Sequence, residues 1–184
     1  MLDMKLGRLF PTSRHYIFDS KMDGDFDDYK GIITSNTAPP RPGRNQKYQV
    51  WQAVKLIPEE IEKWLYHVRH DAPAILVIDE LYSLVFKGKD YSDEFNIIQK
   101  TGRSLPVGTI VCSQELSRIP QNAYKQAVHR LGFYLDGEYD RRIRNNLLKF
   151  KVDDPFDPFG FYYQHQNMRG EPKYYQDIQR FLRF

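Results

Sequence analysis

The chain has 184 residues and a mass of 21.9 kDa, enough for one domain or for one domain with a small appendage. Hydrophobic residues make up 41% and charged residues 28%, so a sizeable core can form and a disordered chain is excluded. The single cysteine, Cys112, excludes a disulfide framework and a cysteine-based zinc site. No apolar run approaches the roughly 18 residues of a membrane span, and the first residues lack the apolar core of a signal peptide. We therefore expect a cytosolic protein with no membrane segment.

Strand-like and helix-like segments alternate along the chain, which predicts an α/β fold with a mostly parallel sheet. Residues 1–9 resemble the end of a helix. The predicted strands lie at 14–19, 47–54, 74–78, 109–112 and 130–135. One predicted helix begins at Pro58, and Ile61, Trp64, Leu65 and Val68 form its buried stripe at helical spacing. Further helices are predicted at about 92–102, 120–128 and 138–149. Residues 35–46 are predicted to form a Pro-rich loop, and two aromatic strands are expected near 160–165 and 173–178.

The strongest chemical signal is Ala74–Ile78 followed by Asp79 and Glu80. A continuous apolar run is typical of a strand buried on both faces, and ligands of open α/β sheets bind beyond the carboxyl ends of such strands. An Asp there can hold Mg²⁺ through its water shell, and the adjacent Glu can polarise a water for attack on a γ-phosphate. The alternative is structural: Asp79 caps a helix and Glu80 is a solvated acid of its first turn.

A second apolar strand ends at Ser113-Gln114, about 35 residues later, with Gly102-Arg103 ahead of it. A Gln beside the acidic pair can orient the attacking water or contact the γ-phosphate. Arg103, in a Gly-led turn, can reach a neighbouring subunit as an arginine finger. The alternatives are an ordinary polar strand end and a surface arginine.

Four segments together resemble the FtsK/HerA superfamily of P-loop ATPases, which includes DNA pumps, conjugation ATPases and viral genome-packaging ATPases. They are IFDSKMDGDF, AILVIDELYSL, TGRSLPVGTIVCSQELSRIPQ and HRLGFYLD, between about Arg14 and Asp136. The resemblance implies a P-loop (ASCE, RecA-like) α/β/α sandwich. It also implies a Walker B Asp79 holding Mg²⁺ through water, a catalytic base Glu80, a sensor Gln114 and a trans-acting Arg103. Asp79, Glu80 and Gln114 would bind the nucleotide. Asp19 and Lys21 are typical of the family but receive no defined chemistry.

One feature of the family is missing, because no G-x-x-x-x-G-K-[ST] occurs in the sequence. The Gly88-Lys89 pair in FKGKD has no preceding strand and no following Ser or Thr, so it cannot form a phosphate cradle. In the family that loop comes directly before the element equivalent to RHYIFD, so we expect the chain to start just after it. By resemblance, the absent strand would lie between the strands near 108–113 and 130–135. The chain alone is then expected to bind ATP poorly and to be inactive.

The resemblance implies ATP-driven DNA translocation or genome packaging by the complete protein, an ATP hydrolase with Mg²⁺ and ATP as cofactors. Its partners would be double-stranded DNA and copies of itself in a hexameric or pentameric ring, in the host cytoplasm or the virion. Residues 1–150 would form the ATPase core, and 151–184 a β-strand arm packed on the same domain. Two alternatives stay open: a non-catalytic structural or assembly protein with a degenerate P-loop fold, and a secretion or filamentous-phage assembly type ATPase.

Other side chains give weaker signals. A net charge of +3 does not indicate nucleic-acid binding by itself. Arg41 and Arg44 are the preferred DNA contacts, and the basic helix at 138–149 is predicted to be a solvated face despite its three arginines, Arg141, Arg142 and Arg144. His67 and His70 are expected to be surface residues because no third metal ligand is evident. Cys112 is expected to be an inert core thiol.

Overall fold

The computed structural model describes ten segments of the chain, and every structural statement below refers to them. They are residues 12–21, 32–36, 48–85, 92–101, 104–114, 116–119, 121–133, 138–148, 160–165 and 172–176. By internal contacts the chain forms two compact units, Met1–Gln114 and Glu115–Phe184. Each unit is described by itself.

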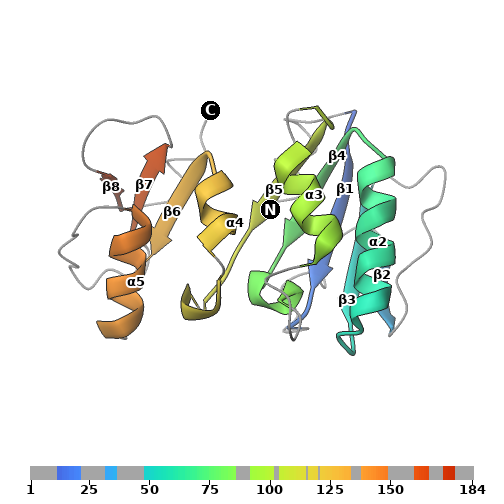
Figure 1. Ribbon diagram of the computed structural model, residues 1–184, viewed down its shortest axis with the longest axis horizontal. Helices are drawn as coiled ribbons and strands as arrows, with labels where there is room; N and C mark the ends of the chain where they lie inside the picture. The colour runs from blue at the N-terminus through green and yellow to red at the C-terminus, as the bar shows by residue number, and fades with distance from the viewer. Residues whose placement is uncertain are drawn as a thin grey trace. The chain divides into compact units, whose positions relative to one another are not determined.

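The first unit is built on a five-stranded sheet in which every pairing is parallel. Its order is β2 (Ile32–Asn36), β3 (Tyr48–Ala53), β1 (Arg14–Asp19), β4 (Ala74–Ile78) and β5 (Val107–Val111) (Figure 1). All five residues of β4 are buried, as the continuous apolar run predicts. The expectation of an α/β fold with a mostly parallel sheet is confirmed.

Helix α2 (Pro58–His70) covers one face of this sheet with the predicted stripe. Proline occupies its first turn together with Glu59 and Glu60, where a missing N–H and negative charge are both favourable. The stripe residues Ile61, Trp64, Leu65 and Val68 are all buried. Trp64 packs against Phe18 and Trp51, with ring centroids 5.8 and 5.5 Å apart. Its indole N–H donates to Gln49 Oε1 at 3.1 Å. These contacts fix the rotation of the helix about its axis and its position along the strands.

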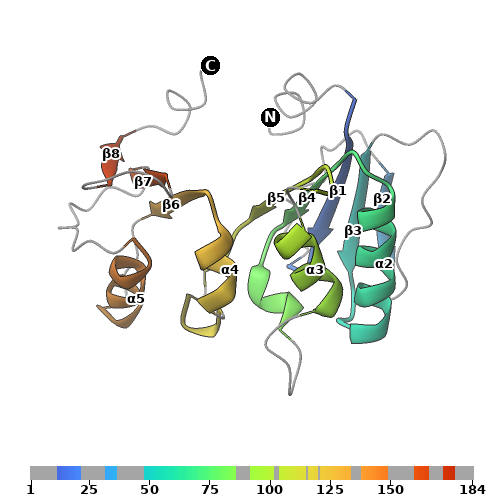
Figure 2. The ribbon, with the colours of Figure 1, turned by 45° about the horizontal axis from the view of Figure 1, so that its top comes forward.

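The opposite face of the sheet is also buried, because Ile17, Val50, Ile75 and Val77 form a core cluster there. The register places Ile17 beside both Val50 and Val77. Helices α2 and α3 (Asp93–Thr101) lie side by side on one face of the sheet in Figures 1 and 2. The described elements of the first unit include no second helical layer, so the three-layer arrangement stays a prediction.

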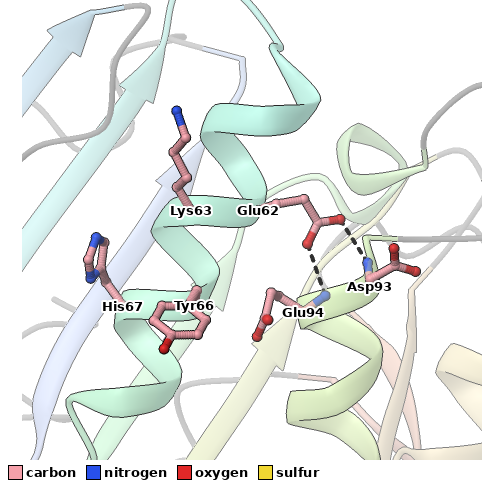
Figure 3. Close-up of a pocket in the computed structure, with 6 residues that line it drawn as sticks. All are labelled: Glu62, Lys63, Tyr66, His67, Asp93 and Glu94. Atoms are coloured by element: carbon pink, nitrogen blue, oxygen red, sulfur yellow. Dashed lines mark hydrogen bonds between the residues drawn. The ribbon is translucent and has the colours of Figure 1, made fainter.

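Helix α3 begins with a cap supplied from another helix. The Glu62 carboxylate of α2 accepts hydrogen bonds from the backbone N–H groups of Asp93 and Glu94 at 2.8 and 2.9 Å (Figure 3). Ser92 Oγ accepts from the Phe95 N–H at 3.1 Å, so three otherwise unpaired N–H groups are satisfied. Arg69 pairs with Glu94 at 2.7 Å and joins the same two helices further along.

At the amino-terminal edge of the sheet, a second polar cluster joins α2 to β1. Arg14 donates to both carboxylate oxygens of Asp71 at 2.5 Å, and the Tyr16 hydroxyl donates to the same carboxylate. Asp71 is the residue that ends α2. Desolvation and the Asp71 carboxylate raise the pKa of Tyr16 well above its usual range. This cluster anchors the end of α2 to the start of the central strand.

The second unit contains a separate antiparallel sheet of order β6-β7-β8. Its strands are β6 (His129–Phe133), β7 (Phe161–His165) and β8 (Lys173–Tyr175), and its helical segments are η2 (Leu116–Arg118), α4 (Gln121–Gln126) and α5 (Glu138–Leu148). Aromatic rings bridge the outer pair of strands: Phe161 stacks on Tyr175 at 5.4 Å, and Tyr162 contacts Tyr174 at 5.1 Å. The two aromatic strands predicted near the end of the chain are confirmed.

Three details differ from the sequence-based expectations. Ser35 and Asn36, predicted to begin a loop, end the short strand β2. Strand β6 was expected in the parallel sheet but pairs antiparallel with β7. Strand β5 was expected to be buried, yet three of its five residues are exposed, because β4 is its only neighbour in the described sheet. The division of the core at residue 150 stays a prediction, as does a further strand between β5 and β6.

Candidate functional site

Polar side chains gather at the carboxyl edge of the parallel sheet, where neighbouring strands end together. They are Asp19 at the end of β1 and Lys21 after it, Gln52 in β3, Asp79 and Glu80 after β4, and Ser113 and Gln114 after β5. Backbone bonds align the ends of β4 and β5: Cys112 N–H donates to Ile78 C=O at 2.9 Å, and Leu81 N–H donates to Cys112 C=O at 2.8 Å. The edge therefore carries a cluster of polar side chains, several of them buried.

Glu80 is buried, with 7% of its surface exposed, and both of its carboxylate oxygens are engaged. Ser113 Oγ donates to Oε1, and the backbone N–H of Gln114 donates to Oε2 at 3.1 Å. Its own carbonyl accepts from Ser83 N–H and Ser83 Oγ at 3.0 and 2.6 Å. The alternative of a solvated first-turn acid is therefore wrong for this residue.

Asp79 lies beside Glu80 but has a different partner. Its Oδ2 is 3.4 Å from the Lys21 ammonium, a long ion pair between side chains that are 15% and 28% exposed. Glu80, not Asp79, stands at the start of the short 3₁₀ segment Leu81–Leu84, which has no side-chain cap. A helix-capping role for Asp79 is therefore wrong.

Asp19 forms the third acidic position of the edge and is completely buried. Its Oδ1 accepts from the backbone N–H of Lys21 at 3.0 Å, and its Oδ2 accepts from Gln52 Nε2 at 3.2 Å. This arrangement turns the chain after β1 and directs Lys21 toward Asp79. It gives Asp19 and Gln52 a positioning role that the sequence alone did not show.

The donor set at this edge suits a hard cation held mainly by other ligands. No group of three or more His, Cys, Asp or Glu side chains that could hold a metal occurs among the described residues. Mg²⁺ in phosphate-binding sites takes one or two carboxylates and completes its shell with waters and substrate phosphates. Asp79, a partly exposed carboxylate with a loose lysine partner, fits that role.

The structure brings together three of the predicted site residues, Asp79, Glu80 and Gln114. Gln114 contacts Glu80 through its backbone N–H, and the residue is exposed. Arg103, Arg41 and Arg44 lie outside the described residues. Sequence reasoning missed the hydroxyl of Ser113, because its approach to Glu80 depends on the register between β4 and β5.

The structure also tests the weaker predictions, which concern one arginine, two histidines and the cysteine. Arg144 is 2% exposed and donates to the Phe133 carbonyl at 3.0 Å, so the prediction that it lies on a solvated basic face is wrong. Its long side chain turns inward and packs over the Tyr162 ring. His67 and His70 are exposed, as predicted. Cys112 is exposed at the end of β5 rather than buried in the core.

One surface depression of the first unit lies away from this edge. It lies between α2 and α3 and is lined by Glu62, Lys63, Tyr66, His67, Asp93 and Glu94 (Figure 3). Its acidic groups are used by the cap of α3 and by Arg69. None of the predicted site residues lines it.

The fold is similar to that of solved viral genome-packaging enzymes. The B204 DNA-packaging ATPase of Sulfolobus Turreted Icosahedral Virus superposes with a TM-score of 0.69 at 15% identity, covering 95% of this chain and 88% of that one. The genome-packaging NTPase B204 of Sulfolobus turreted icosahedral virus 2 gives 0.64 at 15% identity in complex with AMPPCP, covering 96% and 92%. In complex with ATP-gammaS it gives 0.66 at 16% identity, covering 95% and 87%.

No protein-family model matches the chain, and no curated protein matches it either. The similarity is thus one of fold, at an identity too low to carry function with it. Within the described part of the chain, no helix has the length and apolarity needed to cross a membrane.

Proposed function

We propose that this chain contributes the Walker B and sensor side of an ATP-hydrolysing motor that packages or translocates double-stranded DNA. The observation that carries the proposal is the buried Glu80 carboxylate, held by the end of β5 next to the Asp79–Lys21 pair. A carboxylate at the carboxyl end of a parallel sheet is placed where phosphates of bound nucleotides lie in such folds. The similar solved structures are named as genome-packaging enzymes and include complexes with nucleotide analogues.

In this proposal each polar residue at the carboxyl edge has its own role. Asp79 would hold Mg²⁺ through water, and the ion would supply charge neutralisation for the phosphates. Glu80 accepts a proton from the attacking water, and Gln114 orients that water or contacts the γ-phosphate. Lys21 offsets the negative charge of Asp79.

Hydrolysis also needs a phosphate-binding loop, which the 184-residue sequence does not contain. The proposal therefore has two parts that are tested separately. The 184-residue chain should show no binding of ATP-gammaS by calorimetry. A gene product that joins it in frame to an upstream strand and GxxxxGK[ST] loop should hydrolyse ATP in the presence of Mg²⁺.

The decisive variant is Glu80→Gln in that loop-containing protein. The amide keeps the size of the side chain and can still bond to Ser113 and Gln114, but it cannot accept the proton. We expect hydrolysis to fall at least about 100-fold while nucleotide affinity is retained. Glu60→Gln on the exposed side of α2 is the matched control. Full hydrolysis by Glu80→Gln would refute the assignment of the base.

The proposed ring can be tested through Arg103, which is proposed to act on the nucleotide of a neighbouring subunit. Arg103→Ala and Glu80→Gln should each be inactive alone. A mixture of the two should recover hydrolysis, because Glu80→Gln subunits supply Arg103 to sites that retain Glu80. A mixture that stays inactive would place Arg103 in its own subunit's site or outside catalysis.

The DNA partner is tested by salt-dependent binding. Replacing both Arg41 and Arg44 with Ala should weaken binding to duplexes of any sequence and lower the slope of log K against log salt by about 2. Arg142→Ala, on the exposed face of α5, is the matched control and should leave the slope unchanged. Equal binding by all variants would favour a non-catalytic assembly role or a different cargo.

A further inference from the structure

The orientation of the Glu80 carboxylate is set by strand β5 and not by the strand that carries it. The two contacts come from consecutive residues at the end of β5: the Ser113 hydroxyl on Oε1 and the Gln114 N–H on Oε2. Each carboxylate oxygen can accept about two hydrogen bonds. The two contacts therefore fix the plane of the carboxylate and still leave acceptor positions for a water.

The backbone around Glu80 is immobilised independently of these contacts. The flanking residues Ile78 and Leu81 both pair with the backbone of Cys112, and Ser83 holds the Glu80 carbonyl. The remaining conformational freedom of Glu80 lies in its side-chain torsions. Of its two carboxylate contacts, the Gln114 N–H belongs to the main chain, so Ser113 is the one that a side-chain substitution can remove.

We propose that Ser113 is a positioning residue for Glu80. This inference rests on the proposed function, because it assigns to Ser113 the task of aiming the proton acceptor. The hydroxyl holds the carboxylate so that its free acceptor positions face the site of the attacking water. Because the Ser113 hydroxyl bonds to Glu80, its removal is expected to lower turnover and to leave nucleotide binding intact.

The first test measures hydrolysis by the loop-containing protein. Ser113→Ala leaves the carboxylate on a single contact about which it can rotate, and we expect kcat to fall about 10- to 100-fold with KM unchanged. Ser113→Thr keeps the hydroxyl and should restore most of the rate. Ser104→Ala, whose hydroxyl donates to the nearby Thr101 carbonyl, is the matched control. An unchanged kcat in Ser113→Ala, or a loss in KM alone, would overturn the inference.

The second test does not depend on activity and uses the 184-residue chain. Urea unfolding of Glu80→Ala, Ser113→Ala and the double variant gives a double-mutant cycle. We expect the double variant to differ from additivity by a factor of about 10 in the unfolding constant. Strict additivity would mean that the contact is absent and would overturn the inference whatever the enzyme does.

The two experiments separate the possible failures. If the wild-type loop-containing protein does not hydrolyse ATP, the proposed function fails, and the positioning role falls with it even where the cycle shows coupling. If the wild type hydrolyses ATP but the cycle shows no coupling, only the positioning role fails. Coupling together with a lowered kcat and rescue by Thr is the result that supports it.

Discussion

The two edges of the parallel sheet use charged residues in opposite ways. At the amino-terminal edge, the Asp71 carboxylate is satisfied by Arg14 and by the Tyr16 hydroxyl, so its charge is neutralised where it stands. At the carboxyl edge, Asp79 forms a long ion pair with Lys21, while Asp19 and Glu80 accept hydrogen bonds from neutral groups. The first arrangement is suited to holding a helix on a strand. In the proposed function, the second arrangement places negative charge where phosphates and their cations would bind, a cost to stability that functional sites commonly carry.

The largest effect on stability is expected at the amino-terminal edge. Asp71→Ala leaves Arg14 and the buried Tyr16 hydroxyl without their partner, and should lower the free energy of unfolding by about 2–3 kcal/mol. Urea denaturation measures this. Glu60→Ala breaks only the exposed pair with Lys63 and should cost less than about 0.5 kcal/mol. Similar costs for the two variants would mean that the Asp71 cluster contributes no more to stability than the Glu60–Lys63 ion pair.

Tyr16 provides a second test of the amino-terminal edge, through the pH dependence of stability. Its folded-state pKa is raised above the unfolded value, so its contribution to stability is complete below about pH 10 and is lost as the pH rises further. Tyr16→Phe should cost about 1 kcal/mol at neutral pH and should flatten the alkaline fall in stability. Unfolding curves between pH 8 and 11 test this, with Tyr66→Phe on the exposed face as control. An alkaline fall that is unchanged in Tyr16→Phe would contradict the prediction.

At the carboxyl edge, removing a charge should matter far less for stability. Asp79→Asn breaks the long ion pair with Lys21 but also removes one negative charge from an acidic edge, and these effects oppose each other. The free energy of unfolding should change by less than about 0.5 kcal/mol, while Mg²⁺-dependent hydrolysis in the loop-containing protein should be lost. A large loss of stability in Asp79→Asn would mean that this edge is also structural.

The smallest expected effect is on the reaction rate of the Cys112 thiol, which reports charge at the carboxyl edge. Part of the residue's surface is exposed, yet desolvation of the thiol raises its pKa. The Asp79 carboxylate raises the thiol pKa further, and Lys21 lowers it. Asp79→Asn should therefore speed the reaction with a thiol reagent at pH 8 by about two- to threefold, and Lys21→Met should slow it. Identical rates in all three proteins would mean that neither charge acts on this thiol.

Local pattern was enough to predict the two α-helices of the first unit and four of the five strands of its described sheet. The run Ala74–Ile78 is apolar at every position because β4 is buried on both faces, and that is visible in one dimension. The spacing of Ile61, Trp64, Leu65 and Val68 likewise predicted the packed face of α2. Asp79 and Glu80 were found because they follow such a strand. The hydrogen bond between Ser113 and Glu80 could not be predicted, because the two residues meet only once β4 and β5 are paired.

The wrong predictions also have physical causes. Strand β2 was missed because Ile32–Asn36 is short and ends in Ser-Asn, residues that are more typical of turns. The antiparallel pairing of β6 is a property of its partner β7, which lies more than 25 residues further along the chain. Arg144 looked like part of a solvated helix face, but its side chain is long enough to reach the Phe133 carbonyl. The pairing of β6 and the burial of Arg144 were thus decided by contacts outside the local sequence pattern.

The cap of α3 has a consequence for the order in which the protein folds. A nine-residue helix is too short to be stable alone in water, and two of its first N–H groups are satisfied by Glu62, 31 and 32 residues earlier. A peptide of residues 92–101 should therefore show no helix by circular dichroism, whereas a peptide of residues 57–71 retains its own first-turn acids. We expect α3 to form only after α2 has docked, so that Glu62→Ala speeds unfolding and leaves the folding rate nearly unchanged.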